Sequence, residues 1–511
     1  MSRSAYDDVD VNKIARDAMC RYGFDPDFSA LVKQQVKAVR EDLQDAAGVD
    51  GVRDLRGLLW SSIDNADSLD LDQIEYCERG PRQEILIKVA IADVDLFVPK
   101  GSPVDQRAAN NGTSVYTGVE TFPMLPDRLS TDISSLCPGG ERMAVVIEFA
   151  VLSNGSIRQG DIYRAMVINK VKLVYEEVGA WLEARGPAPE AFAHIPGLEE
   201  QVRLQDEAAE RLKTFRMDQG ALDLESLETK AIKEDGVVVA LVLPQENRAQ
   251  YVIENFMIAA NRTVMDRLSK AGVMVIQRVV RIPKDWPGIM KVAAEFHEAL
   301  PLEPSAKALS VFLLKRKAAD PLRFPDLSLT IVKLMGPGEY EMLEPGKPPI
   351  GHFGLAISDY THATAPNRRY VDVIIQRLIK AVIFGRSCPY TRKELVEHAA
   401  WCTDRDKASK KVERFMRKVE AALILRGRVG EEFEGIVTGA SEKGTYVRLT
   451  EPPVEGRVVQ SGVRMSVGQK VNVRLTDINP YEGHIDLVPV GAVRSGFPRP
   501  PVRKTRRPRY S

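Results

Sequence analysis

A cluster of acidic side chains near residue 70 is the first feature of this 511-residue chain that could carry chemistry. Four aspartates lie within nine residues of the segment IDNADSLDLDQ (63–73), which contains no lysine or arginine: Asp64, Asp67, Asp70 and Asp72. Clustered carboxylates repel one another, divalent cations relieve that repulsion, and hard oxygen ligands suit Mg²⁺ or Mn²⁺. The segment is not an EF-hand, because it lacks the glycine at loop position six and the closing glutamate. The pattern indicates a metal site, with a solvated acidic loop as the alternative.

The spacing of these aspartates sets a condition on the backbone. Asp70 and Asp72 are two residues apart, so an extended segment points both side chains to one side. Asp64 would lie about 20 Å from Asp70 if the chain stayed extended. Sharing ions therefore requires the segment to curl back, which the turn-forming asparagine, aspartate and serine residues between them permit.

A second polar segment, YTHATAPNRRYVD (360–372), places two arginines directly after a proline. The apolar-periodic run that follows indicates a loop entering a helix. Arginines beside a helix N-terminus suit phosphate binding, and an arginine near acid-bound metals can stabilise the negative charge that grows on a transferring phosphate. The alternative is that Arg368 or Arg369 pairs with Asp372 on the surface.

Histidines and cysteines offer no comparable pattern. The six histidines form no HExxH or similar cluster, and His352 and His362 are expected to be structural. The five cysteines are scattered and have no CxxC spacing, which argues against structural zinc and for a reducing compartment.

The elements that must position these side chains are strands and long helices. Residues 53–428 mix apolar strand segments such as ILIKVAIADVDLFV (85–98) and MAVVIEFAVL (143–152) with helical patterns at 250–272 and 368–383. A further charged helix is expected at 393–426. The chain is therefore predicted to be a multidomain α+β protein.

Residues 1–52 have helical spacing in VNKIARDAMCRYG and FSALVKQQVKAVREDL, separated by the breaker GFDPD. A helix-turn-helix element is one interpretation. Two short amphipathic packing helices are the commoner alternative.

Residues 429–490 predict a small barrel. Five short segments alternate apolar and polar residues between glycines: EEFEGIVTGA, GTYVRLT, EGRVVQ, QKVNVRLTDI and GHIDLVP. This pattern suits a five-stranded OB barrel, and the segment resembles an S1 domain, a common RNA-binding OB fold. Tyr446 is placed where an aromatic ring could stack on a base, or could simply pack on the sheet.

The charge of the chain is unevenly distributed. Its 71 basic and 71 acidic side chains balance, but residues 491–511 hold seven of the basic ones and no acidic one. That proline-rich tail is expected to contact RNA phosphates, or else only to aid solubility. No segment approaches the ~18–20 apolar residues of a membrane span, and the start has no secretory signal, so a cytoplasmic location is expected.

Taken together, the motifs resemble the RNB catalytic domain of the ribonuclease II and ribonuclease R exoribonucleases, followed by a C-terminal S1 domain. The resemblance begins at RDLR (53–56) and includes IDNADSLDLDQ, VAIADVDLFVPKGSPVD, NNGTSVYTGVETFPMLPDRLS, SSLCPGGER, GALDLE, IENFMIAAN and YTHATAPNRRYVD. It implies hydrolytic 3′→5′ exoribonuclease activity on RNA with a free 3′ end. The products would be nucleoside 5′-monophosphates, and the cofactor would be Mg²⁺, with Mn²⁺ as the alternative.

The resemblance also assigns roles to individual positions. Asp72 and Arg368 would be catalytic, with Arg368 stabilising the scissile phosphate. The metal positions are Asp64, Asp70, Asp72 and Gln73. The positions expected to contact RNA are Tyr116 as the aromatic clamp, Tyr175 and Glu254 at the ribose, Leu224, Glu413 near the 3′-terminal nucleotide, and Tyr446. The implied mechanism uses two ions, one lowering the pKa of the attacking water and one stabilising the leaving 3′-oxygen.

Several positions depart from the family pattern. Gln73 stands where another aspartate is usual, and a neutral amide holds a divalent ion more weakly than a carboxylate does. Leu224 replaces a stacking phenylalanine and has no π face. Ala365 and Asn367 replace the usual serine and isoleucine, and residues 1–52 are too few for the usual pair of cold-shock domains. A catalytically weak RNA-binding protein and a metallophosphoesterase acting on something other than RNA are therefore the competing interpretations.

Overall fold

A six-stranded sheet organises the larger of two units in the computed structural model; this unit contains residues 15–227 and 244–413. The structure describes residues 9–39, 51–225, 230–234, 237–242, 246–321, 323–441, 444–459, 465 and 469–490. The basic tail at 491–511 lies outside the described residues, as does part of the predicted N-terminal helical region. The predicted multidomain α+β fold is confirmed.

The strands of this sheet occur in the order β1 (Val52–Asp54), β8 (Ile157–Val174), β2 (Trp60–Asp64), β3 (Gln73–Arg79), β4 (Ile85–Ala92) and β7 (Glu141–Val151). The long strand β8 pairs antiparallel with β7 along its first part and parallel with β2 at its end. At that end Asp64 lies opposite Val174. The pairing therefore brings the start of the acidic segment next to Tyr175, the first residue after β8.

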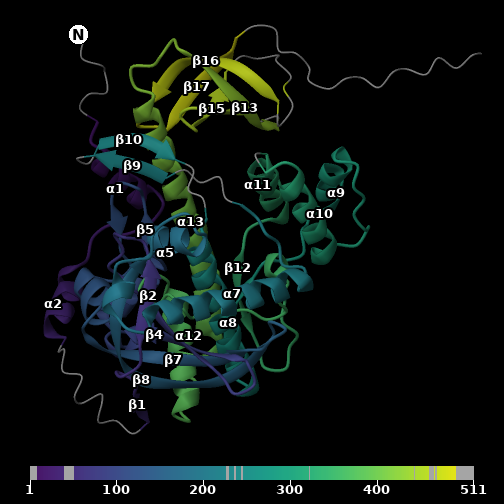
Figure 1. Ribbon diagram of the computed structural model, residues 1–511. Helices are drawn as coiled ribbons and strands as arrows, with labels where there is room; N and C mark the ends of the chain where they lie inside the picture. The colour runs from purple at the N-terminus through teal and green to yellow at the C-terminus, as the bar shows by residue number, and fades with distance from the viewer. Residues whose placement is uncertain are drawn as a thin grey trace, which may run out of the picture. The chain divides into compact units, whose positions relative to one another are not determined.

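Helices cover this sheet and bury its apolar side chains. Helix α7 (Leu198–Gln219) packs on β3 and β7, and α8 (Arg248–Lys270) packs on β2, β7 and β8 (Figure 1). Helix α8 begins with a capping box in which the Asn247 and Gln250 side chains each bond the other residue's backbone N–H. Helix α5 (Tyr175–Leu182) packs on β2 and β8, and the short helix α6 (Ala191–His194) packs on α7. The helix predicted at 250–272 is confirmed as α8.

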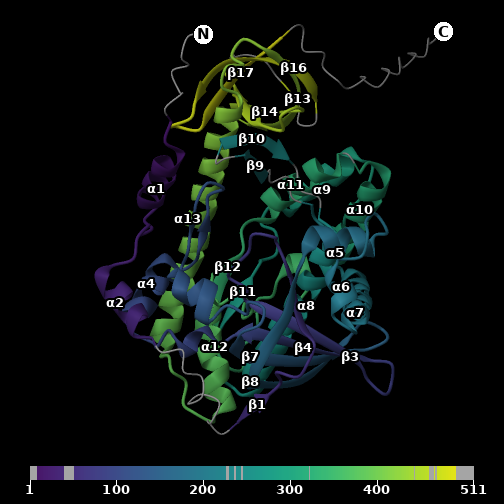
Figure 2. The same ribbon diagram turned by 60° about the vertical axis from the view of Figure 1, so that its left-hand side comes forward.

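Short elements lie between β4 and β7 and between α8 and helix α12 (Tyr370–Ile383), whose predicted position is confirmed. They are η1 (Val94–Leu96), α4 (Pro103–Asn111), β5 (Val115–Tyr116), β6 (Thr121–Phe122), the π-helical turn η2 (Arg128–Ile133), β11 (Val275–Val279), β12 (Glu339–Leu343) and η3 (Phe353–Leu355). Between β11 and β12 the chain forms three helices with a core of their own, α9 (Trp286–Glu295), α10 (Ala306–Ala319) and α11 (Phe324–Met335), which group together in Figures 1 and 2.

Two N-terminal helices are confirmed, α1 (Val11–Arg21) and α2 (Ala30–Ala38). Helix α2 contacts α4 and buries Val32 and Val36 in the main core. Ser29 caps it by accepting a hydrogen bond from the backbone N–H of Val32. These contacts favour the packing interpretation of α2 over a helix-turn-helix.

The smaller unit contains residues 1–14, 228–243 and 414–511. Its described part includes the hairpin β9 (Lys230–Glu234) and β10 (Val237–Val242), and a closed five-stranded barrel (Figure 2). The barrel strands are β13 (Glu432–Ser441), β14 (Gly444–Leu449), β15 (Glu455–Val458), β16 (Lys470–Asn479) and β17 (His484–Pro489). All five predicted strands are present, and their alternate side chains, such as Val447, Leu475 and Leu487, fill the barrel core.

The predicted charged helix is α13 (Arg392–Ile424), which passes along the chain from the larger unit into the smaller one. Among the helices of the described ranges, none combines the length and apolarity required to cross a membrane.

Candidate active site

The acidic segment forms a folded-back loop between two neighbouring strands. Strand β2 ends at Asp64 and β3 begins at Gln73. Leu71 anchors the loop because its side chain is buried, its N–H donates to Ser135 Oγ at 2.9 Å, and its carbonyl accepts from the N–H of Leu136 at 2.9 Å. The curl that ion sharing requires is therefore present.

Hydrogen bonds from Ser68 and Lys172 hold the first turn of this loop. The Ser68 hydroxyl donates to Asp64 Oδ1 at 2.7 Å. Lys172 of β8 donates from Nζ to the carbonyl oxygens of Ala66 at 2.8 Å and Ser68 at 2.6 Å. Asp67 is exposed. Backbone carbonyls thus bind the lysine, which leaves the loop carboxylates for other partners.

Asp70 lies within reach of three other members of the predicted site. Burial raises the pKa of the Asp70 carboxyl, repulsion from Asp64 raises it further, and attraction to Arg368 opposes both effects. Tyr116, which is 43% exposed at the end of β5, lowers the pKa of Asp70 through a side-chain hydrogen bond. Asp70 therefore interacts with Asp64, Tyr116 and Arg368, three other residues predicted for the site.

Asp72 and Arg368 are in direct contact. Asp72 is 3% exposed, its Oδ1 accepts the backbone N–H of Asn367 at 2.9 Å, and its Oδ2 accepts Arg368 Nε at 3.3 Å. Burial raises the pKa of Asp72 to about 7, and attraction to Arg368 acts in the opposite direction. The Arg368 side chain is 47% exposed, so its guanidinium contacts Asp72 on one side and solvent on the other.

This pKa predicts how replacement of Asp72 changes stability. Because the folded-state pKa of about 7 exceeds the unfolded value near 4, the wild-type chain loses stability as the pH rises from about 4 to 7. Above pH 7 the full loss in the free energy of unfolding is present, because Asp72 is then ionised in both the folded and the unfolded chain. Asp72→Asn removes this titration, so its melting temperature in EDTA should exceed that of the wild type by about 2–4 °C at pH 8 and show no such gain at pH 4. Thermal unfolding of both proteins across this pH range tests it; a difference that does not grow with pH would contradict it.

Buried polar contacts orient the loop that carries Arg368. The carboxylate of Asp372 accepts the backbone N–H of Ala365 at 2.8 Å and Arg369 Nη2 at 2.7 Å. Asn367 is buried, and its Oδ1 accepts the Ser134 hydroxyl at 2.7 Å. Arg369 therefore pairs with Asp372, as one alternative held, but in the interior, while Arg368 is directed toward Asp72.

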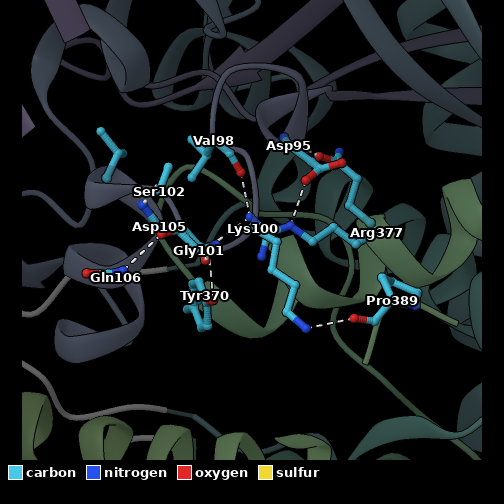
Figure 3. A network of polar contacts seen from close by, with 12 residues as sticks. Asp95, Val98, Lys100, Gly101, Ser102, Asp105, Gln106, Tyr370, Arg377 and Pro389 are labelled. Carbon is cyan, nitrogen blue, oxygen red and sulfur yellow. Dashed lines mark hydrogen bonds and ion pairs between the residues drawn. The ribbon is translucent and has the colours of Figure 1, made fainter. Parts of the chain in front are cut away.

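Helix α12, which follows this loop, is anchored by an arginine network (Figure 3). Arg377 is 4% exposed and donates to Asp95 Oδ1 at 2.6 Å, to Asp105 Oδ1 at 2.8 Å and to the carbonyl of Val98 at 2.5 Å. Tyr370, the first residue of α12, also donates to Asp105 Oδ1, at 2.9 Å. The network fixes the helix whose preceding loop presents Arg368.

Replacing Arg377 with methionine is expected to lower the free energy of unfolding by about 3 kcal/mol, because buried Asp105 loses the arginine that pairs with it and, among the described residues, Asp95 keeps only Lys380 as an ion-pair partner. Urea unfolding measures the change. The matched control is Arg386→Met, which alters an arginine just beyond the same helix whose contact is with the Phe384 ring. Equal losses in the two variants would contradict a role for the network.

Tyr175 and Glu254 lie on different helices. Tyr175 begins α5 beside Asp64, and burial together with the negative charges of Asp64 and Glu75 raises the pKa of its hydroxyl. Glu254 is exposed on α8 and pairs with Arg216 at 3.6 Å. Tyr175 therefore lies beside the acidic residues, whereas Glu254 forms an ion pair with Arg216.

Three other predicted RNA contacts lie elsewhere in the fold. Leu224 is partly buried and packs on the core of α9, α10 and α11. The side chain that was expected to wedge against a base is therefore in contact with protein in this structure. Glu413 is partly exposed on α13. Tyr446 is partly exposed on β14 of the barrel, directly opposite Arg457 of β15.

The histidines have structural partners, as expected. His352 Nδ1 accepts the N–H of Leu355 at 3.1 Å, and His362 Nδ1 contacts the Tyr340 hydroxyl at 2.9 Å. Burial lowers the pKa of His352 to about 4 and lowers that of His362 as well. Both rings are therefore neutral at physiological pH.

Sequence reasoning missed Glu75, a fully buried carboxylate at the third position of β3. Burial raises its pKa well above the usual value, with repulsion from Asp64 as the second cause. Its signal in the sequence was an acid between Ile74 and Tyr76, two residues after Gln73. Gln73 itself is 8% exposed as the first residue of β3.

The donor set fits a hard divalent cation in chemistry but is not closed around a common point. In the parts of the chain that the structure describes, no three Asp, Glu, His or Cys side chains converge as they would around a bound metal. The available donors are nevertheless oxygen atoms, Asp64 and Asp70 repel each other, and the Glu75 oxygens have no hydrogen-bond partner among the described residues. A divalent cation would relieve both conditions.

Fold and site together define an α+β domain with an acidic, arginine-flanked centre, followed in the chain by an OB-type barrel. The chain belongs to the RNB family: residues 52–385 match the RNB domain, and residues 431–490 match the RNase II-type exonuclease C-terminal S1 domain.

Comparison with individual proteins agrees with this assignment. Ribonuclease R of Thermotoga maritima is 32% identical over 427 residues, which cover 80% of this chain and 58% of that protein. The structure of Mycoplasma genitalium RNase R has the same fold, with a TM-score of 0.84 at 22% identity over 94% of this chain and 78% of that one. A yeast pseudonuclease shares the fold at a TM-score of 0.67 and 17% identity, over 91% and 58% of the two chains. The chain spans about three fifths of the length of the ribonuclease R relatives that it matches.

Proposed function

We propose that this protein is a hydrolytic 3′→5′ exoribonuclease that degrades RNA to nucleoside 5′-monophosphates with the help of a divalent metal, Mg²⁺ or Mn²⁺. The observation that carries the proposal is the contact between buried Asp72 and half-exposed Arg368, next to Asp70 and Tyr116. Membership of the RNB family and the name of the Thermotoga relative support it.

Arg368 is suited to hold the scissile phosphate. Its Nε contacts Asp72, which fixes the plane of the guanidinium, and the exposed part of the group can donate two parallel hydrogen bonds to phosphate oxygens. Because Asp72 is buried and also holds the Asn367 N–H, the arginine is preorganised before RNA binds. Charge that develops on the phosphate therefore meets a fixed cation.

The oxygen donors on β2, the acidic loop and β3 would hold the metal. Asp64, Asp70 and Asp72 are the carboxylates proposed as ligands, and Gln73 adds an amide oxygen. A bound divalent ion would supply a water of lowered pKa and stabilise the leaving oxygen. The loop contacts of Ser68 and Leu71 hold these donors in place.

Aromatic side chains beside the acids are suited to position the last nucleotides. Tyr116 is 43% exposed and interacts with Asp70 through its hydroxyl, which suits its ring to stack on a base at the edge of the acidic site. Tyr175 lies on the Asp64 side of the site, where its hydroxyl can meet a ribose. The solved structures of Mycoplasma genitalium RNase R include complexes with single-stranded and double-stranded RNA, which supports RNA as the substrate.

Labelled oligoribonucleotides test the proposal. With a 5′ label, the product ladder should shorten progressively, and with a 3′ label, the label should appear at once as mononucleotide. EDTA should stop both reactions. Internal cleavage products, or shortening from the 5′ end, would contradict the proposed direction.

A non-catalytic RNA-binding protein is the second candidate. The specific observation in its favour is the neutral Gln73 in the acidic site, together with the occurrence of this fold in a pseudonuclease. In the same assay it would bind RNA and leave both labels intact at every metal concentration.

A further inference from the structure

Glu75 is an anomaly in the core of the larger unit. Its side chain is 0% exposed, and neither carboxylate oxygen has a hydrogen-bond partner among the described residues. Burying an acid without a partner costs free energy whether it is ionised or protonated. A leucine in this strand would pack without that cost, so folding alone does not account for the glutamate.

The position of Glu75 on β3 brings it near the start of the acidic segment. Side chains alternate along β3, so Glu75 shares a face with Gln73, about 7 Å further along the strand. It lies opposite Ser61 of β2, whose hydroxyl is also buried without a hydrogen-bond partner in the described structure. Its carboxylate is close enough to Asp64 for the two to repel, and both act on the Tyr175 hydroxyl.

We propose that Glu75 is an additional carboxylate ligand of the divalent-cation site and replaces the negative charge that Gln73 does not supply. The inference rests on the proposed metal-dependent function. Glutamate is one methylene longer than aspartate, which extends its reach from a position two residues further into the strand. A cation between Asp64 and Glu75 would give the buried carboxylate the partner that it lacks and cancel the repulsion between the two acids.

Direct metal binding tests the assignment without RNA or turnover. Mn²⁺ is titrated into the full chain, and free Mn²⁺ is measured by electron paramagnetic resonance. Glu75→Gln should weaken binding by about tenfold or more. Gln73→Asp/Glu75→Gln should restore it to within about threefold of the wild type, because a carboxylate returns to the same face of β3.

Two further variants secure the comparison. Glu78→Gln is the matched control: it changes a glutamate of the same strand on the other face, where it accepts a bond from the Tyr76 hydroxyl at 3.4 Å, and should bind Mn²⁺ like the wild type. Glu75→Leu repeats the titration with an apolar side chain that suits the buried position. If Glu75→Gln fails to fold, Glu75→Leu still tests the inference. Mn²⁺ should raise the melting temperature of the wild type more than that of Glu75→Leu.

The outcomes separate this inference from the proposed function. Wild-type affinity in both Glu75→Gln and Glu75→Leu would overturn the inference alone. If the double variant binds Mn²⁺ no better than Glu75→Gln, the claim that Glu75 replaces the negative charge missing at position 73 would be overturned. A wild-type chain that binds no Mn²⁺ would overturn the metal dependence of the proposed function and this inference with it.

Discussion

Asp72→Asn is expected to reduce RNA cleavage by about 10⁴-fold while RNA affinity stays within about threefold of the wild type. The asparagine keeps the shape of the side chain but loses the charge that holds Arg368 Nε at 3.3 Å. Its amide also has one acceptor oxygen for two donors, the Asn367 N–H and the Arg368 guanidinium. Most RNA contacts lie outside this carboxylate, so binding should survive. Single-turnover cleavage of a 5′-labelled oligoribonucleotide gives the rate, and fluorescence anisotropy in EDTA gives the affinity.

Asp127→Asn is the matched control for this experiment. Asp127 is an exposed aspartate whose side chain does not cap the turn that it precedes, and its replacement should leave both rate and affinity unchanged. Near-normal turnover by Asp72→Asn at saturating Mg²⁺ would refute the proposed role of this carboxylate. Equal loss of binding and cleavage would instead assign Asp72 to RNA binding.

The barrel shows how much of this fold local sequence determines. Each of its strands alternates apolar and polar side chains between glycines, and the period of two sets both the strand and the face that it buries. The helices α8 and α12 were predictable for the same reason, because their apolar positions recur every three to four residues. Patterns of this kind depend on neighbours in the chain.

The contacts of the site depend on neighbours in space. Asp72 and Arg368 are separated by 296 residues, and no spacing in either segment predicts that one side chain holds the other. Family resemblance supplied both residues, but the pairing follows from the way β3 and the loop before α12 meet. The Arg377 network is similar, since its partners Asp95 and Asp105 come from segments far from α12 in the sequence.

Glu75 and Leu224 mark the limits of the sequence argument. Alternation in β3 alone allows Glu75 to point to solvent, and only the packing of the larger unit shows that it is buried. Leu224 was assigned to RNA by its position in a motif, and the structure packs it on three helices, α9 to α11, whose core no local pattern had predicted. Both cases turn on tertiary packing, which decides whether a side chain is available.

Replacement of Arg368 is expected to lower the maximal cleavage rate by about 10³-fold for alanine and about 10²-fold for lysine. Alanine removes the cation that faces the phosphate, whereas lysine keeps the charge but loses the planar pair of donors. Attraction to Arg368 holds down the pKa of Asp72, so its removal should raise that pKa further above the ordinary aspartate value. If cleavage requires ionised Asp72, the acid limb of the pH–rate profile moves to higher pH in Arg368→Ala and moves less in Arg368→Lys.

The shift of the acid limb separates an arginine that acts on both Asp72 and the phosphate from one that only binds RNA. An arginine that only binds RNA would raise KM and leave both kcat and the pH profile unchanged. Arg185→Ala, which removes an exposed arginine paired with Glu183, controls for a general loss of positive charge. It should leave kcat and the acid limb of the pH–rate profile unchanged. A fall in kcat with an unmoved acid limb would keep Arg368 at the phosphate but refute its influence on Asp72. An unchanged kcat in Arg368→Ala would refute the catalytic assignment itself.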